Sequence, residues 1–176
     1  MTSFMIKAHE GLPLPQSWNT VPDCPFCRII RGETPAFRVY EDDKIIAILD
    51  IAPLRSGHTL VIPKIHIPRV SELPPEFAAA VGAGVTRVAN AIAQALQNTA
   101  LNIVCNQEYA QAVPHVHYHI IPAPKAGELS SDIVEKVDHV TGTLSEKEML
   151  KKEFEYRHEM NDDEGQQLAE RIRARL

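Results

Sequence analysis

Residues 115–121 read His-Val-His-Tyr-His-Ile-Ile, and this stretch is the most informative in the chain. Valine, tyrosine and isoleucine favour a β-strand, so we expect a strand over 115–121. Alternate side chains of a strand share one face at a spacing of about 6.5–7 Å. His115, His117 and His119 would therefore line one face. Because imidazoles titrate near neutral pH and are costly to bury together, the pattern indicates phosphate chemistry, a metal site, or both.

The composition fits one globular domain with an appendage. The chain has 176 residues, and a hydrophobic content of 44% is enough for a core. A net charge of −5 argues against nucleic-acid binding, which generally requires a basic face. We see no apolar run long enough to span a membrane and no secretory signal. We therefore expect reduced cysteines and a cytoplasmic location, with the nucleus also open to so small a protein.

Apolar periodicity predicts an α+β fold. Five strands are expected, at residues 37–41, 45–49, 59–62, 101–105 and 115–121. A long helix should begin at Pro75 and run to about Gln97, because its apolar residues recur at steps of three and four. A short helix from Asp23 to about Arg31, ended by Gly32, should precede the first strand. The order of strands, long helix and strands favours a largely antiparallel sheet with the helix on one face.

The two ends of the chain differ in character from the domain at residues 23–124. Prolines interrupt residues 1–22, so we expect a flexible N-terminal arm from which Trp18 packs on the domain. Residues 125–176 carry 9 Lys/Arg against 13 Asp/Glu, a net charge of −4, and should form a helical C-terminal extension.

Two helices are expected in this extension, at about 145–160 and 162–176. The second has Leu168, Ile172 and Leu176 on one stripe, and acidic residues that suit its N-terminus. Such a helix either folds back on the domain or binds a partner.

Cys24 and Cys27 form a CxxC motif that is open to three interpretations. A redox pair would need a preceding strand, whereas a proline-rich segment lies there. Two packed thiols without chemistry are a second possibility. Half of a zinc site is the interpretation we favour, because two thiolates at this spacing can hold one metal and histidines are available. His58 and His66 flank the third strand, and spacing alone does not decide which would ligate a metal.

The chain resembles the histidine triad (HIT) superfamily, whose signature is His-φ-His-φ-His-φ-φ, where φ is apolar. Residues 115–121 fit this signature without a break. Further motifs match in the family's order, at residues 24–31, 49–53, 57–64 and 106–111. The resemblance covers about 23–124 and implies a HIT-like antiparallel five-stranded sheet with one long helix, followed here by the C-terminal helical extension.

The resemblance implies a covalent mechanism. His117 is similar to the family nucleophile, which attacks the α-phosphorus of a nucleotide and gives a nucleotidyl-histidine that water hydrolyses. His58 and His119 would then supply hydrogen bonds around the phosphate, and His115 would brace His117. A purine nucleotide is the implied substrate, and a nucleoside monophosphate of the AMP type the implied product. The nucleotide-binding positions matched are Asn106 and Gln111 at the phosphate or leaving group, Asp50 at the ribose hydroxyls, and Phe26, Leu49 and Ile51 at the base.

Family members with the CxxC motif also imply a structural zinc. Carried over to this chain, the ligands are Cys24, Cys27, His66 and His115. Four such ligands leave no open position for catalysis, so the metal would tie the N-terminal helix to the strand that presents His117. The resemblance further implies a homodimer in which two domains share one continuous sheet.

The leaving group stays open at this stage. Many family members have Ser or Thr just after the glutamine, whereas this chain has Ala112, which lacks a hydroxyl for the phosphate. The CxxC motif favours a nucleoside phosphoramidate hydrolase of the Hint-like branch. The alternatives are a dinucleoside polyphosphate hydrolase, a nucleotide-binding scaffold with negligible turnover, and a metalloenzyme that uses the triad histidines as ligands.

Overall fold

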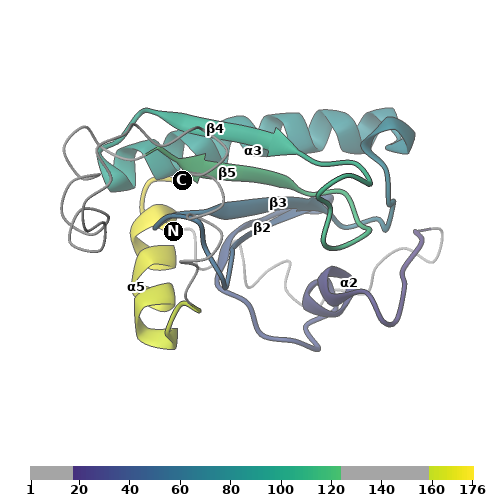
Figure 1. The fold of residues 1–176 in the computed structure, drawn as a ribbon, viewed down its shortest axis with the longest axis horizontal. Helices are drawn as coiled ribbons and strands as arrows, with labels where there is room; N and C mark the ends of the chain where they lie inside the picture. The colour runs from purple at the N-terminus through teal and green to yellow at the C-terminus, as the bar shows by residue number, and fades with distance from the viewer. Residues whose placement is uncertain (1–17, 124–158) are drawn as a thin grey trace, which may run out of the picture.

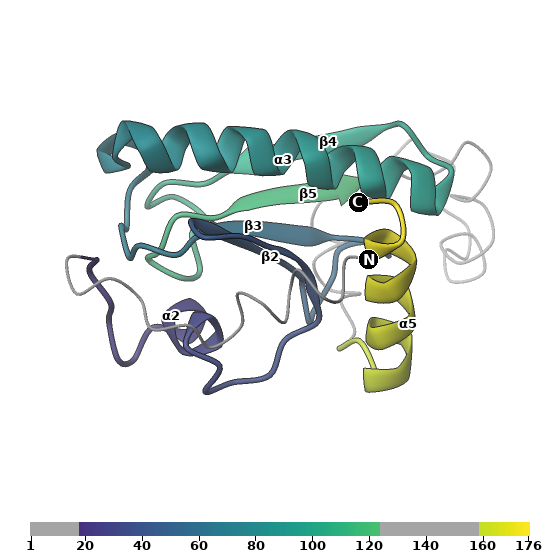
Figure 2. The ribbon, with the colours of Figure 1, turned by 180° about the vertical axis from the view of Figure 1, so that it is seen from behind.

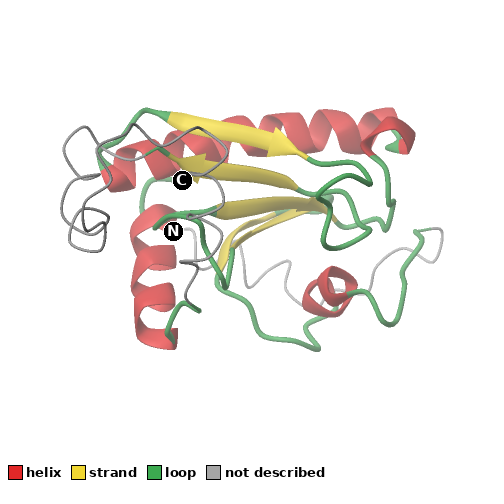
Figure 3. Cartoon of the chain, in the orientation of Figure 1, coloured by secondary structure: helices red, strands yellow, loops and turns green. Residues whose placement is uncertain are grey.

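The computed structural model describes residues 18–123 and 159–176. Its elements are α2 (Pro25–Ile30), β1 (Arg38–Glu41), β2 (Ile45–Leu49), β3 (Thr59–Pro63), the 3-10 turn η1 (Val70–Glu72), α3 (Pro75–Leu96), β4 (Leu101–Cys105), β5 (Tyr118–Pro122) and α5 (Asp162–Arg173). The strands form one antiparallel sheet in the order β1-β2-β3-β5-β4 (Figures 1 and 3). The α+β class, the five strands and the long helix are therefore confirmed.

The two faces of the sheet are covered by different helices. Ile45, Ala47 and Leu49 of β2 point to the core that α3 and α5 cover. The intervening Ile46 and Ile48 point to the other face, where α2 packs. Because both faces of β2 are covered, every residue of the strand is buried, and this explains its unbroken apolar sequence. The face under α2 is the one on which the histidines gather.

The helix α3 lies along the sheet on the side seen in Figure 2. Pro75 occupies its first turn, where the missing N–H costs nothing, and Gln97 ends it in the left-handed conformation with φ 52°. The ring of Trp18 meets Phe77 of α3 edge-on at 4.9 Å between centroids, so the predicted packing of Trp18 on the domain is confirmed. Neither α3 nor any other helix in the described ranges has the length and apolar character to cross a membrane.

The strand predicted over 115–121 begins only at Tyr118, so its predicted start was wrong. The β3–β5 ladder stops at the pair Val61 and Tyr118, although β3 itself stays paired with β2 up to Pro63. The backbone N–H of Val116 donates instead to the carbonyl of Ile67 at 2.8 Å. His115 and His117 therefore lie in the segment that leads into β5, and only His119 lies on the strand.

The helix α5 folds back on the domain and runs crosswise to α3 (Figure 2). The Asn161 side chain caps its start by accepting a hydrogen bond from the backbone N–H of Glu164. Leu168, Ala169 and Ile172 lie in the core with α3. The helix begins where the sequence predicts and ends three residues earlier. The predicted helix over 145–160, apart from its last two residues, and the rest of the segment 124–158 lie outside the described residues, as do residues 1–17.

Gly165 of α5 offers a test of this packing. A Cβ there would lie 2.5 Å from two atoms of the rigid Phe37 ring, whereas a Cβ at the exposed Gly82 of α3 would meet nothing within 4 Å. We expect Gly165→Ala to lower the free energy of unfolding by about 1–3 kcal/mol. Gly82→Ala should raise it by about 0.5–1 kcal/mol, because alanine is the better helix former. Urea unfolding of both variants measures the difference, and equal effects would refute the docking of α5.

Candidate active site and metal centre

His117 is held in one tautomer. Its Nδ1 lies 2.7 Å from the carbonyl oxygen of His115, and because a carbonyl only accepts, Nδ1 carries the proton. The lone pair of the neutral ring is therefore on Nε2. Burial lowers the pKa of His117, and this keeps the imidazole neutral and nucleophilic. The Phe26 ring covers it edge-on at 5.1 Å between centroids.

His58 and His119 form a hydrogen-bonded pair beside His117. The backbone N–H of Leu54 donates to Nδ1 of the buried His58 at 3.2 Å, so the other nitrogen, Nε2, is the donor in the neutral ring. That Nε2 lies 2.9 Å from Nδ1 of His119, which therefore accepts. Nε2 of His119 then carries a hydrogen. The His117 and His119 rings lie 4.9 Å apart between centroids, so this donor belongs to a ring next to His117.

Asp50 follows β2 and joins this pair. Its Oδ1 accepts a hydrogen bond from the backbone N–H of Ala52 at 2.9 Å, and its Oδ2 lies 3.4 Å from Nδ1 of His58. One nitrogen cannot accept from Leu54 and donate to Asp50 at the same time. The neutral form of His58 uses the first contact, and a protonated His58 would use the second. The carboxylate therefore stabilises a positive charge on the pair of histidines.

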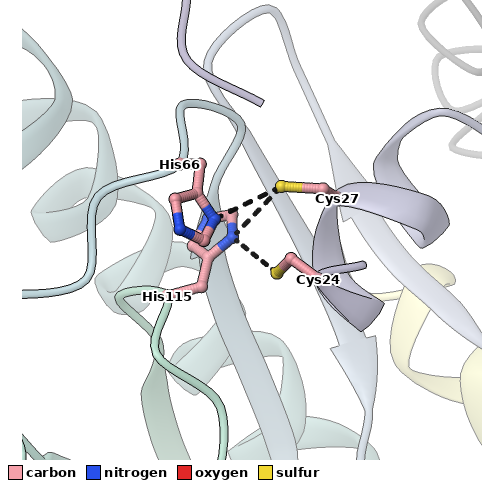
Figure 4. Close-up of side chains that lie close together, drawn as sticks. All are labelled: Cys24, Cys27, His66 and His115. Carbon is pink, nitrogen blue, oxygen red and sulfur yellow. Dashed lines mark hydrogen bonds between the residues drawn. The ribbon is translucent and has the colours of Figure 1, made fainter. Parts of the chain in front are cut away.

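The two cysteines and two histidines meet on the sheet face under α2 (Figure 4). Nδ1 of His115 lies 3.5 Å from Sγ of Cys24 and 3.7 Å from Sγ of Cys27, and Nδ1 of His66 lies 3.4 Å from Sγ of Cys27. A tetrahedral zinc with sulfur ligands at about 2.3 Å and nitrogen ligands at about 2.05 Å sets sulfur–nitrogen separations of about 3.5–3.6 Å. These four residues therefore fit a tetrahedral zinc.

The protons of this cluster also suit a metal. Nε2 of His115 donates to the carbonyl of Pro63 at 2.8 Å, and this directs the unprotonated Nδ1 at the cysteines. A hydrogen bond with Cys27, helped by His115, lowers the pKa of the Cys24 thiol to about 3. The pKa of Cys27 is raised by the same hydrogen bond and by burial. The pair thus shares one proton, and a thiolate is ready in the cluster.

The loop between β4 and His115 places Asn106 and Gln111. Cys105 and Tyr118 form the last pair of β4 and β5, and Asn106 and His117 each come one residue beyond this pair. The Gln111 amide donates to the carbonyl of Pro68 at 2.8 Å and accepts from the backbone N–H of Glu108 at 2.8 Å. In this structure Gln111 therefore braces its own loop, and its amide nitrogen has a second hydrogen with which to meet a phosphate.

The three residues expected to contact the nucleotide base do not lie on one side of the sheet. Phe26 is buried against His115 and His117, and Ile51 is 60% exposed after β2. Leu49 instead points to the opposite face, into the core under α3. Ile48, not Leu49, packs with Phe26 on the α2 side. The period-2 alternation of β2 predicts this side for Ile48 once Ile46 is placed under α2.

Three contributors to the site went unnoticed in the sequence because they act through the backbone. The N–H of Leu54 orients His58, and the carbonyl of Pro63 orients His115. The N–H of Met160 donates to the carbonyl of Ile51 at 2.8 Å, beside Asp50. Every residue has a backbone carbonyl, and every residue except proline has an N–H, so the side chains gave no signal.

Comparison with known families identifies the domain. The family model described as the HIT domain matches residues 31–126. Over 102 residues, or 57% of this chain and 52% of the relative, the sequence is 46% identical to a protein of Arabidopsis thaliana named adenylylsulfatase HINT3. The match thus spans about half the length of that relative. A Schizosaccharomyces pombe protein named adenosine 5′-monophosphoramidase hnt1 is 42% identical over 102 residues, or 57% of this chain and 74% of the relative.

The fold is also similar to that of solved structures. A structure described as a Zn-bound histidine triad family protein from Mycobacterium smegmatis aligns with a TM-score of 0.64 and 32% identity. The alignment covers 86% of this chain and 91% of that one. The sheet, the long helix and their order are therefore shared with a protein of the same family in which zinc is bound.

Proposed function

This chain belongs to the HIT domain family, and we propose that it hydrolyses nucleoside phosphoramidates or related nucleotide conjugates at the α-phosphate. The observation that carries this proposal is the fixed tautomer of the buried His117, whose Nε2 lone pair is free to attack phosphorus. The hydrogen-bonded pair of His58 and His119 beside it leaves the Nε2–H of His119 as a donor for the phosphate. The names of the two relatives, an adenylylsulfatase and a monophosphoramidase, support a nucleotide as the substrate.

The residues support a two-step reaction. In the first step Nε2 of His117 forms a bond to the α-phosphorus, the phosphorus–nitrogen bond to the leaving amine breaks, and His119 gives that amine a proton. In the second step water attacks the nucleotidyl-histidine and passes a proton to His119. The His117–phosphorus bond then breaks, and the nucleoside monophosphate is released. Asn106 and the Gln111 amide would hold the phosphate oxygens, with His115 orienting His117.

A neutral pair of histidines is not sufficient for the first step. Because one proton must leave His119, the His58–His119 pair has to hold one extra proton when the substrate is bound. The Asp50 carboxylate, 3.4 Å from Nδ1 of His58, stabilises that cation. The same carboxylate would accept hydrogen bonds from the ribose hydroxyls, and Phe26 and Ile51 would contact the purine.

We also propose that Cys24, Cys27, His66 and His115 hold a structural zinc. When bound, the metal supplies a closed tetrahedral cross-link and no open position for substrate. Cys24 and Cys27 fix α2, and His115 belongs to the segment that orients His117. The cluster therefore stabilises the backbone carbonyl on which the tautomer of His117 depends.

A second candidate substrate is a dinucleoside polyphosphate, which differs only in the leaving group. Ala112 offers no hydroxyl to the leaving group. Tyr109, in the same loop, is 89% exposed and presents an aromatic ring on which a second base could stack.

The proposed assembly is a homodimer that extends the sheet. β4 is an edge strand, and its Ile103 is 46% exposed. An edge strand with an exposed apolar side chain is suited to pairing with a second copy. The three free cysteines fit the reducing cytoplasm or nucleus as the location.

The first experiment compares adenosine 5′-phosphoramidate with a diadenosine polyphosphate for the wild type and His117→Ala. We expect faster cleavage of the phosphoramidate and a loss of at least about 1,000-fold in rate in the variant, because the nucleophile is absent. Acid quenching of the wild type should trap labelled nucleotide on the protein, and the variant should trap none. A near-wild-type rate in a folded His117→Ala variant would refute the nucleophile, and preference for the dinucleotide would favour the second candidate.

The zinc proposal is tested with Cys24→Ser, because a hydroxyl is a much poorer ligand than a thiolate. We expect less than one zinc per chain and a fall in Tm of about 5–10 °C, the shift that a loss of about 2–3 kcal/mol produces at this size. The rate at saturating substrate should change less. Cys105→Ser is the matched control, since Cys105 lies on β4 and is only half-buried. Zinc content that is the same in all three proteins would disprove the ligand set.

A further inference from the structure

One peptide group beside Asp50 is held at both of its ends. The carbonyl of Ile51 accepts a hydrogen bond from the backbone N–H of Met160 at 2.8 Å. The N–H of Ala52 belongs to the same peptide group and donates to Oδ1 of Asp50 at 2.9 Å. In a trans peptide the C=O and the N–H point in opposite directions, so one contact determines the orientation of the other. If this peptide rotated, both hydrogen bonds would be lost.

Met160 is itself fixed by the helix that follows it. Asn161 is the N-cap of α5, and its side chain accepts from the backbone N–H of Glu164 at 2.9 Å. Along the helix, the Arg171 guanidinium donates to the carbonyl of Ala95 at 2.9 Å, which ties α5 to the end of α3. The Met160 side chain also packs on the core under α3. The N–H that reaches Ile51 therefore belongs to a rigid part of the chain.

The Asp50 end of this arrangement lies in the active site. Asp50 has a second oxygen 3.4 Å from Nδ1 of His58, so a rotation of the carboxylate would disturb both the pair of histidines and any group bound to Asp50. Hydrogen bonds in series polarise one another, so the Met160 contact also strengthens the one from Ala52 to Asp50.

We propose that the backbone N–H of Met160 is a positioning group for the nucleotide site: through the Ile51–Ala52 peptide it fixes the Asp50 carboxylate that receives the ribose hydroxyls. This inference rests on the proposed function, in which Asp50 binds ribose. It gives the C-terminal helix a role in substrate affinity, although none of its side chains has to touch the nucleotide.

Met160→Pro and Met160→Leu separate the N–H from the side chain. Proline has no N–H, whereas leucine keeps it and conserves the side-chain volume. We expect KM for adenosine 5′-phosphoramidate to be about three- to tenfold higher in the proline variant than in the leucine variant, the effect of one lost hydrogen bond. A fall in kcat, from a weaker contact between Asp50 and His58, should be equal for substrates with and without ribose hydroxyls, because only KM reports the ribose contact.

A substrate without ribose hydroxyls distinguishes positioning from a structural effect. With the 2′,3′-dideoxy analogue, the KM ratio of the two Met160 variants should fall to about one. Asp50→Asn should likewise raise KM for the substrate with ribose hydroxyls and leave KM for the dideoxy analogue close to the wild-type value. A second pair tests the same segment without proline: Asn161→Ala removes the capping oxygen, and Asn161→Asp keeps it. This pair provides the test if Met160→Pro does not fold. The alanine variant should reproduce the hydroxyl-dependent rise in KM, and the aspartate variant should restore the wild-type value.

Each result decides the inference. If KM is raised equally for both substrates in Met160→Pro relative to Met160→Leu, or is not raised at all, the positioning role is overturned. Cleavage by the wild type would still leave the proposed function in place. If Asp50→Asn shows no dependence on the hydroxyls, the ribose role of Asp50 fails and the inference falls with it. If the wild type cleaves neither substrate, the proposed function fails first.

Discussion

The hydrogen bond from His117 Nδ1 to the carbonyl of His115 is the contact on which the site depends. It decides which nitrogen of His117 carries the proton, and so which nitrogen can attack. His115 in turn directs its own ring at the cysteines through the carbonyl of Pro63. His115 and His117, two positions apart, thus connect the cluster of two cysteines and two histidines to the proposed nucleophile. The end of the β3–β5 ladder makes this possible, because a residue inside a regular ladder would have its carbonyl committed to the neighbouring strand.

The division of the sheet into two faces keeps this polar site next to a stable core. On the α3 side the buried core is apolar, with polar contacts such as that between Arg87 and Tyr40 beside it, whereas ionisable groups lie buried on the α2 side. The buried Glu41 is a further example, because it lies between Arg38 and Lys64. Arg38 also donates to the carbonyl of Ile29 at 2.6 Å, which joins α2 to β1. Removing one partner would leave a buried charge without compensation, which is strongly destabilising even where the intact pair adds little net stability.

Periodic patterns predicted the elements well, and the site less completely. The steps of three and four in α3 and the apolar run of β2 follow from packing against one or two faces, which a sequence records directly. The start of β5 at Tyr118 depends on where β3 loses its partner, and that is a property of two distant segments. The same limit applies to Gln111, whose amide donates to the carbonyl of Pro68, a residue 43 positions away that the local sequence does not reveal. Leu49 and Ile48 differ by one position, which in a strand places their side chains on opposite faces, so Leu49 lies in the core under α3.

The contact between Met160 and Ile51 shows how an appended helix can acquire a role in a site without a recognisable motif. The donor is a backbone N–H, so almost any residue at this position would supply it. What has to be specified is the place of the donor, and this depends on side chains elsewhere in α5, such as Leu168 in the core and Gly165 against Phe37. Selection for substrate affinity would then act on the packing of the helix. Under the proposed positioning role, a change in α5 far from the histidines that lowers the stability of the helix would also lower the affinity for the nucleotide.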